Sequence, residues 1–142
     1  NRISKKEAKE YIKKAEVVWI SGGDTLKQIK NIKEYDLIET LQNREKITIG
    51  MSAGSINMAK RVVLAKDIND NIPELSIYDG IGLVDINIEP HFDPTDEEHN
   101  KDIYEASKSS TIYGLYDDSF IKVVDDEIEI YGDYIKYEKI NE

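Results

Sequence analysis

The sequence contains no cysteine among its 142 residues. Without a thiol, the chain can form no disulfide, thiolate zinc site or iron–sulfur cluster, and it has no cysteine nucleophile. It also lacks any apolar run approaching the roughly 20 residues that a membrane-spanning helix needs, and no signal peptide is visible. We therefore expect a cytoplasmic protein with no membrane partner.

Positive charge is scarce, because 19 Lys and Arg residues face 29 Asp and Glu residues, giving a net charge of −10. Nucleic acids require clustered cations, so we expect no nucleic-acid partner. A hydrophobic content of 39% supports a packed core. At roughly 150 residues per domain, residues 1–142 are predicted to form a single domain. Since the first residue is Asn1 and a helical pattern follows at once, we also expect N-terminal βα units to be missing.

Strand-like and helix-like patterns alternate along the first two thirds of the chain. Apolar runs of strand length fall at 16–20, 46–50, 62–65 and 83–88. Helical spacing falls at 4–15, with Ser4 as N-cap and Glu7 at the capping-box position, and at 25–43, 55–60 and 95–108. Residues 66–82 are predicted to be loop, and short strands are predicted at 111–116, 120–124, 127–131 and 134–139. This order predicts an α/β fold, a parallel sheet with flanking helices in three layers, ending in an antiparallel β meander.

The segment Gly50-Met51-Ser52-Ala53-Gly54 lies between a predicted strand and a predicted helix. This is the context of a nucleophile elbow, in which small residues allow a sharp turn that exposes the serine hydroxyl. The Ala53 N–H would then point toward a substrate oxyanion at a helix N-terminus. The alternative interpretation is that Ser52 merely caps the helix.

A serine nucleophile needs a base, and the chain has two histidines. His91 follows a predicted parallel strand, at the kind of strand end where α/β sheets form their sites. His99 lies in a polar helix and is predicted to be solvated. A carboxylate should orient the imidazole, and the residues alone leave several candidates open, namely Asp67, Asp70, Glu74, Glu89 and Asp93.

A second turn, Gly22-Gly23-Asp24, also lies at a predicted strand end. Its glycines would let the backbone approach a ligand, and a free backbone N–H in this turn could supply a second oxyanion donor. Asp24 could equally cap the next helix, and the two interpretations are compatible.

Together these motifs resemble the peptidase E / cyanophycinase family of serine peptidases (peptidase family S51), whose fold is similar to that of class I glutamine amidotransferases. The resembling segments occur in the family's order at 15–25, 50–55, 79–83, 90–92 and 112–121.

This resemblance implies that Ser52 is the nucleophile and His91 the base. It implies that Asp67, fifteen residues after the serine, is the triad acid, with Asp93 or Glu89 as alternatives. Gly23 and Ala53 would be the oxyanion donors, and Gly22 and Asp24 would contact substrate. The family uses no metal or cofactor and hydrolyses amide bonds after N-terminal or β-linked aspartate. The expected partner is thus a small peptide substrate, and a homodimer is compatible with these features.

The chain departs from the family in its cations. Peptidase E reads the substrate aspartate with an arginine after its histidine, whereas the arginines here are Arg2, Arg44 and Arg61. Lys101 and Lys108 are the substitutes to consider, but lysine binds a carboxylate only as a point charge. We therefore expect no strict aspartate selectivity. The alternative function is a non-catalytic amidotransferase-like domain that binds a small ligand or a protein partner.

Overall fold

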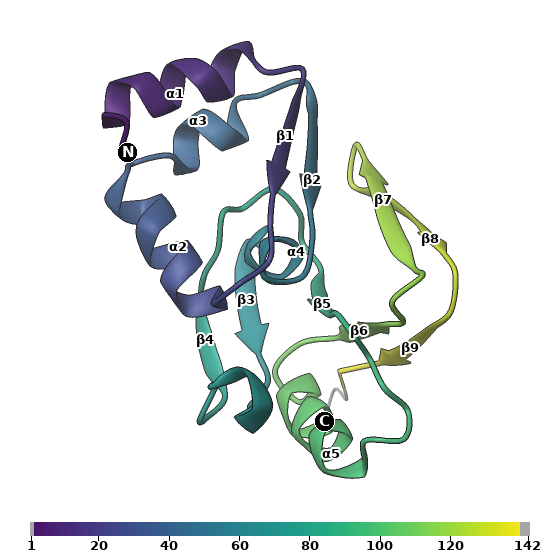
Figure 1. Cartoon of the computed structure of the whole chain (residues 1–142). Coiled ribbons are helices and arrows are strands. Elements are labelled where there is room, and N and C mark those ends of the chain that lie inside the picture. The colour runs from purple at the N-terminus through teal and green to yellow at the C-terminus, as the bar shows by residue number, and fades with distance from the viewer. Residues whose placement is uncertain (1, 140–142) are drawn as a thin grey trace.

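The structure is a computed structural model, and it describes residues 2–139. Helix α1 (Lys5–Lys14) begins after Ser4, whose hydroxyl accepts a hydrogen bond from Glu7 N at 3.1 Å, as the predicted N-cap requires. Strands β1 (Val17–Ile20) and β2 (Ile47–Gly50) pair in parallel. The chain between them forms α2 (Thr25–Glu34) and α3 (Ile38–Gln42). All three helices lie on one side of the β1–β2 pair (Figure 1).

The β1–β2 pair is buried unequally on its two faces. One face packs on the helices through a cluster of buried residues, Ile20, Ile29, Leu41 and Ile81. The other face is apolar but open, and Trp19 there keeps 56% of its surface exposed beside Val17, Ile47 and Ile49. Parallel strands are normally covered on both faces. The uncovered face is therefore an unpartnered apolar surface, and the expected N-terminal βα units stay a prediction.

The middle of the chain departs from the predicted loop over 66–82. Strand β3 (Arg61–Leu64) follows α4 (Ala53–Asn57) and pairs antiparallel with β4 (Ser76–Asp79). A 3₁₀ turn, η1 (Ile68–Asp70), precedes β4. The loop prediction is wrong for β4, because this four-residue strand is stabilised by pairing with β3 and not by a local pattern of its own.

The C-terminal third combines parallel and antiparallel pairing. Strand β6 (Ile112–Leu115) pairs in parallel with β5 (Asn87–Glu89) and antiparallel with β9 (Tyr134–Tyr137). In the chain between β6 and β9, strands β7 (Phe120–Val124) and β8 (Glu127–Tyr131) form a hairpin, which is a separate two-stranded sheet. Helix α5 (Glu97–Ser107) connects β5 to β6. The carboxyl ends of β5 and β6 consequently lie at the same edge of their sheet.

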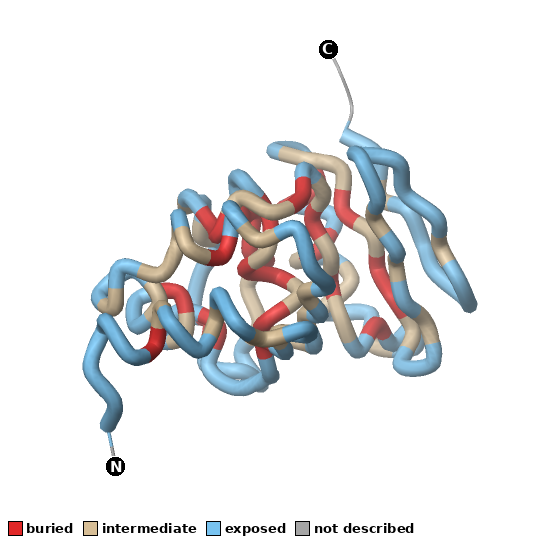
Figure 2. The backbone as a smooth tube through the Cα atoms, turned by 90° about the horizontal axis from the view of Figure 1, so that it is seen from above, coloured by how far each residue is buried: buried red, intermediate tan, exposed pale blue. Residues whose placement is uncertain are grey.

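Buried backbone runs through the middle of the molecule, while its two ends are largely exposed (Figure 2). A second buried cluster packs α5 against β6 and β3, and it includes Phe92, Ile103 and Ile112. Over residues 2–139, no helix is both long and apolar enough to span a membrane.

Candidate active site

Ser52 occupies a strained turn between β2 and α4. Its φ of 55° and ψ of −118° lie outside the regions that non-glycine residues prefer. Met51 N donates to Ile20 O at 2.9 Å and so fixes the turn to the end of β1. A Cβ on Gly54 would collide with the Ile20 carbonyl, and one on Gly50 would approach Gly54 O within 2.8 Å. The flanking glycines are therefore required by close backbone packing, as the elbow motif predicts.

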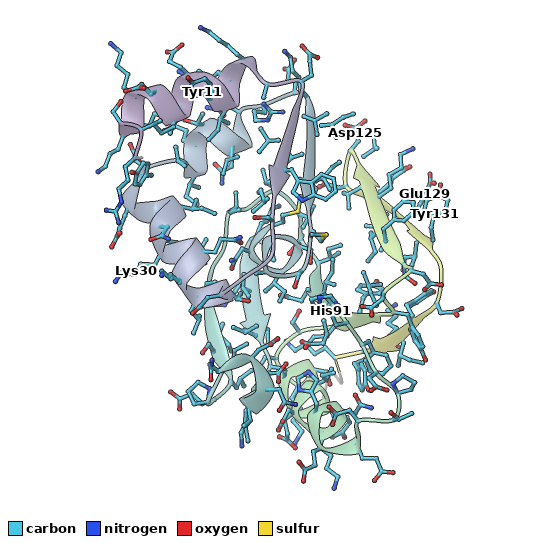
Figure 3. The ribbon with its side chains drawn as sticks, in the orientation of Figure 1. Tyr11, Lys30, His91, Asp125, Glu129 and Tyr131 are labelled. Carbon is cyan, nitrogen blue, oxygen red and sulfur yellow. The ribbon has the colours of Figure 1, made fainter. Side chains whose placement is uncertain are left out.

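His91 follows β5 and faces this turn. Its Nε2 lies 3.2 Å from Ser52 Oγ, within hydrogen-bond distance. The residue has a φ of 57°, a second strained backbone position in the same site. Figure 3 labels His91 near the middle of the molecule, beside the end of β5. The structure thus brings together the two residues that the sequence pairs as nucleophile and base.

The carboxylate that contacts His91 is Asp117. His91 Nδ1 lies 2.6 Å from Asp117 Oδ1. Because an ionised carboxylate only accepts, Nδ1 carries the proton and Nε2 is left to accept from the serine. Ser52, His91 and Asp117 therefore form one continuous chain of hydrogen bonds, in the order in which a catalytic triad is connected.

The prediction that Asp67 orients His91 is wrong in this structure, and so are both alternatives. Asp67 Oδ2 lies 3.6 Å from His99 Nε2, and Glu89 also contacts His99. Asp93 accepts from Thr95, whose hydroxyl lowers the pKa of that carboxyl.

A signal for Asp117 was present in the sequence but depended on knowing the strand pairing. Asp117 lies two residues after the end of β6 at Leu115, in the gap between the strands predicted at 111–116 and 120–124. Once β6 is known to run parallel to β5, residues after both strands meet at one sheet edge. The residues alone do not reveal this pairing, and the family resemblance points to Asp67 instead.

His99 was predicted to be solvated, and this is also wrong. Its side chain is only 16% exposed, and its Nε2–H donates to Glu89 Oε1 at 2.7 Å. That hydrogen bond is the main reason why the pKa of His99 rises to about 9, whereas burial raises the pKa of Glu89. One nitrogen of His99 and one carboxylate oxygen each of Glu89 and Asp67 lie within 4.8 Å of one another. An imidazole with two carboxylates is also a ligand set that suits a divalent cation. His99 Nε2, the nitrogen that lies near both carboxylates, carries the proton that it donates to Glu89, whereas a nitrogen bound to a metal carries none. We therefore assign an ion-paired cluster.

The Gly22–Asp24 turn lies against the elbow. A Cβ on Gly22 would come within 3.2 Å of Ser52 Cβ, and Gly23 has a φ of 128° that favours glycine. Asp24 Oδ1 accepts from Lys27 N at 3.1 Å and so caps α2. The turn opens on a pocket of about 270 Å³, lined by Gly22, Asp24, Lys27, Gln28, Asn31 and Ile32. Its substrate-binding role stays a prediction.

Two backbone amides beside Ser52 are the predicted oxyanion donors. The Ala53 N–H belongs to the first residue of α4, where helix geometry leaves amides without an intrahelical acceptor. The Gly23 N–H makes no backbone hydrogen bond among the described residues. Both lie in turns that flank Ser52, and their role as oxyanion donors stays a prediction.

The buried side-chain amide of Asn57, which the sequence analysis did not single out, holds the helix after the elbow in place. Asn57, at the end of α4, donates to Thr25 O at 2.9 Å and to Gln28 Oε1 at 3.0 Å. The Tyr78 hydroxyl donates to the side-chain oxygen Oδ1 of Asn57 at 2.7 Å. The burial of Tyr78 raises the pKa of its hydroxyl, which stays protonated as this donation requires. Asn57 therefore joins α4, α2 and β4 in a fully satisfied network.

An α/β fold that presents a serine on a strand–helix elbow, next to a histidine–aspartate pair, is typical of serine hydrolases. The model of Peptidase family S51 matches residues 1–131 of this chain. The chain therefore belongs to peptidase family S51, as its motifs suggested.

Curated relatives of this chain are named peptidase E. Peptidase E of Salmonella typhi is 30% identical over 125 residues, covering 79% of this chain and 53% of the relative. Peptidase E of a Nostoc species is 28% identical over 140 residues, covering 90% of this chain and 57% of the relative. The chain thus spans about half the length of these curated relatives.

Solved structures show the same fold. A provisionally named peptidase E protein from Listeria monocytogenes superposes with a TM-score of 0.72 at 21% identity, covering 92% of this chain and 66% of the other. A peptidase from an acI-B1 Actinobacterium gives a TM-score of 0.68 at 16% identity, covering 96% and 62%. The predicted α/β fold, similar to that of class I glutamine amidotransferases, is confirmed.

Proposed function

We propose that this protein hydrolyses amide bonds of small peptides by a serine mechanism. The observation that carries the proposal is the chain of contacts from Ser52 Oγ to His91 Nε2, at 3.2 Å, and from His91 Nδ1 to Asp117 Oδ1, at 2.6 Å. Membership of peptidase family S51 supports it. Asp117 replaces the carboxylate expected from the sequence.

In this mechanism Ser52 Oγ attacks the scissile carbonyl carbon while His91 Nε2 takes its proton. Asp117 holds the Nδ1–H tautomer and stabilises the imidazolium that forms. The Ala53 and Gly23 N–H groups stabilise the oxyanion. His91 then returns the proton to the leaving amine, and an acyl-enzyme remains on Ser52. A water attacks this ester, giving its proton to His91, and the acid is released as the proton returns to Ser52 Oγ.

A fluorophosphonate probe tests the proposal directly. We expect one equivalent of probe to attach to the native protein, because only an activated serine reacts rapidly. The heat-denatured protein, in which the Ser52–His91 contact is lost, is the control and should not be labelled. If the native and denatured proteins label equally slowly, the protein is a non-catalytic binding domain instead.

We further propose a single domain, a small peptide as substrate and a cytoplasmic location, and leave a homodimer as the assembly to test. The length of 142 residues supports the single domain, and the small, open pocket of about 270 Å³ beside the Gly22–Asp24 turn supports a small substrate. The acidic net charge of −10 is the reason to exclude nucleic acid as a partner.

We expect an Asp-Leu peptide to be cleaved no better than Ala-Leu. The cation that lines the pocket beside Ser52 is Lys27, and Asp24 in the same pocket offsets its charge. Arg44 donates to the Ile47 carbonyl and Arg61 pairs with Asp79, so neither is directed at substrate.

The ratio of kcat/KM for the two peptides measures this selectivity. Lys108, one of the sequence-based candidates, forms an ion pair with Glu105 at 3.0 Å, so it offers no dedicated carboxylate site. A preference for aspartate of a hundredfold, about 2.7 kcal/mol in transition-state binding, would contradict the expectation. Loss of such a preference in Lys27→Gln would then identify Lys27 as the reader.

A further inference from the structure

The segment that carries His91 begins and ends at two side chains that contact each other. Glu89 is the last residue of β5, and His99 lies in the first turn of α5. His99 Nε2–H donates to Glu89 Oε1 at 2.7 Å, which joins the two ends of segment 89–99. His91 therefore stands on a short loop that is closed by a side-chain hydrogen bond at its base.

The loop needs such a closure because His91 adopts a backbone conformation that its own chemistry disfavours. A non-glycine residue at a φ of 57° persists only where the surrounding structure holds it. Within the loop, Phe92 N donates to Leu115 O at 2.9 Å and Asn100 Nδ2 donates to Asp93 O at 3.1 Å. These bonds hold the residues after His91, while the Glu89–His99 bond fixes the residues on both sides of it.

Burial makes this contact costly to break. The side chains of Glu89 and His99 are 11% and 16% exposed, so their opposite charges are little screened by solvent. Asp67 approaches His99 Nε2 at 3.6 Å from the segment before η1 and adds a second negative charge. Leaving either member without its partner would place an uncompensated charge in a buried site.

We infer that the buried Glu89–His99 pair is a clamp that positions His91 against Ser52. Glu89 and His99 are thus positioning residues for the proposed serine reaction, on which this inference rests. They touch neither the nucleophile nor the base. Opening the clamp should release the loop 90–98 and lower the fraction of molecules in which His91 Nε2 reaches Ser52 Oγ.

The clamp should respond to pH in a defined direction. The pKa of His99 is raised to about 9, above its ordinary value of 6.5, so its stabilising charge is fully present below pH 6.5 and is lost as the pH rises through about 9. Burial raises the pKa of Glu89, so the ion pair is also lost when Glu89 is protonated in acid. The titratable groups that face the pair are Asp67 and Asp70 around η1, Asp96 at the start of α5, and Tyr137 on β9.

His99→Gln tests the clamp, with Glu98→Gln on the exposed side of the same helix turn as the matched control. Hydrogen bonds to charged groups are the stronger ones, so we expect kcat to fall roughly tenfold to a hundredfold in His99→Gln, with KM little changed. The wild-type labelling rate should decline above about pH 9, and His99→Gln should lack that decline. Glu98→Gln should behave as the wild type.

Amide hydrogen exchange of loop 90–98 supplies a readout that needs no activity. We expect exchange at Phe92 to rise roughly tenfold to a hundredfold in His99→Gln and to stay unchanged in Glu98→Gln. In the double variant His99→Gln/Glu89→Gln, kcat should fall no further than in either single variant, because both substitutions remove the same contact. If exchange and kcat in His99→Gln match the control, the clamp is refuted. Failure of the wild type to label would instead refute the proposed function, while the exchange measurement would still decide the clamp.

Discussion

Ser52→Ala should abolish fluorophosphonate labelling and lower peptidase activity by about 10⁴-fold or more. Ser52 Oγ is the only serine oxygen that a histidine approaches within residues 2–139, at 3.2 Å from His91 Nε2. Removing it deletes the atom that forms the acyl-enzyme, and only the oxyanion donors and substrate binding would remain to accelerate the reaction. Activity is measured as kcat/KM on a dipeptide, and labelling as probe incorporated per molecule.

The matched control is Ser76→Ala. Ser76 lies on β4, and among residues 2–139 its hydroxyl has one hydrogen bond, a long one of 3.4 Å to Glu74 O. This variant should keep both labelling and activity. A Ser52→Ala protein that retained full activity would show that another residue is the nucleophile. If Ser76→Ala also lost activity, the loss in Ser52→Ala could be explained by impaired folding and would not identify the nucleophile.

The elbow could be predicted from sequence because its determinants are local. Gly50, Ser52 and Gly54 lie within five residues, and the strand before them and the helix after them show in the hydrophobic pattern. The same holds for the Ser4 cap of α1, whose partner Glu7 is three residues away. In both cases one short segment contains all the groups that fix its conformation.

The missed features depend on pairing between distant segments. Asp117 reaches His91 only because β6 runs parallel to β5, and His99 is buried only because α5 packs its first turn against Glu89. Strand β4 exists through its pairing with β3. Many turns of this sequence contain acidic residues, and nothing in their local sequence indicates which one will contact an imidazole. The resemblance to the peptidase E family therefore favours Asp67, whereas the strand pairing places Asp117 at His91.

Asp117→Asn is expected to lower kcat by roughly 10² to 10⁴-fold, with less change in KM. An amide can present its NH₂ group to the imidazole, which stabilises the wrong tautomer and removes the charge that supports the imidazolium. The upper limit applies to a buried aspartate. Here the side chains of Asp117 and His91 are 80% and 64% exposed, so solvent screens the pair and a smaller loss is expected.

Asp118→Asn is the control, since this neighbouring carboxylate is exposed and, within the described part of the chain, accepts a single side-chain hydrogen bond, from the Ser119 hydroxyl at 3.4 Å. It carries the same change of charge in the same turn and should keep wild-type kcat. Asp67→Asn should cost less than Asp117→Asn, because Asp67 contacts His99 and not His91. If Asp67→Asn lost more than Asp117→Asn while both proteins stayed folded, the carboxylate that orients the base in the working enzyme would not be Asp117. Equal kcat in Asp117→Asn and Asp118→Asn would show that the His91–Asp117 contact contributes nothing to catalysis.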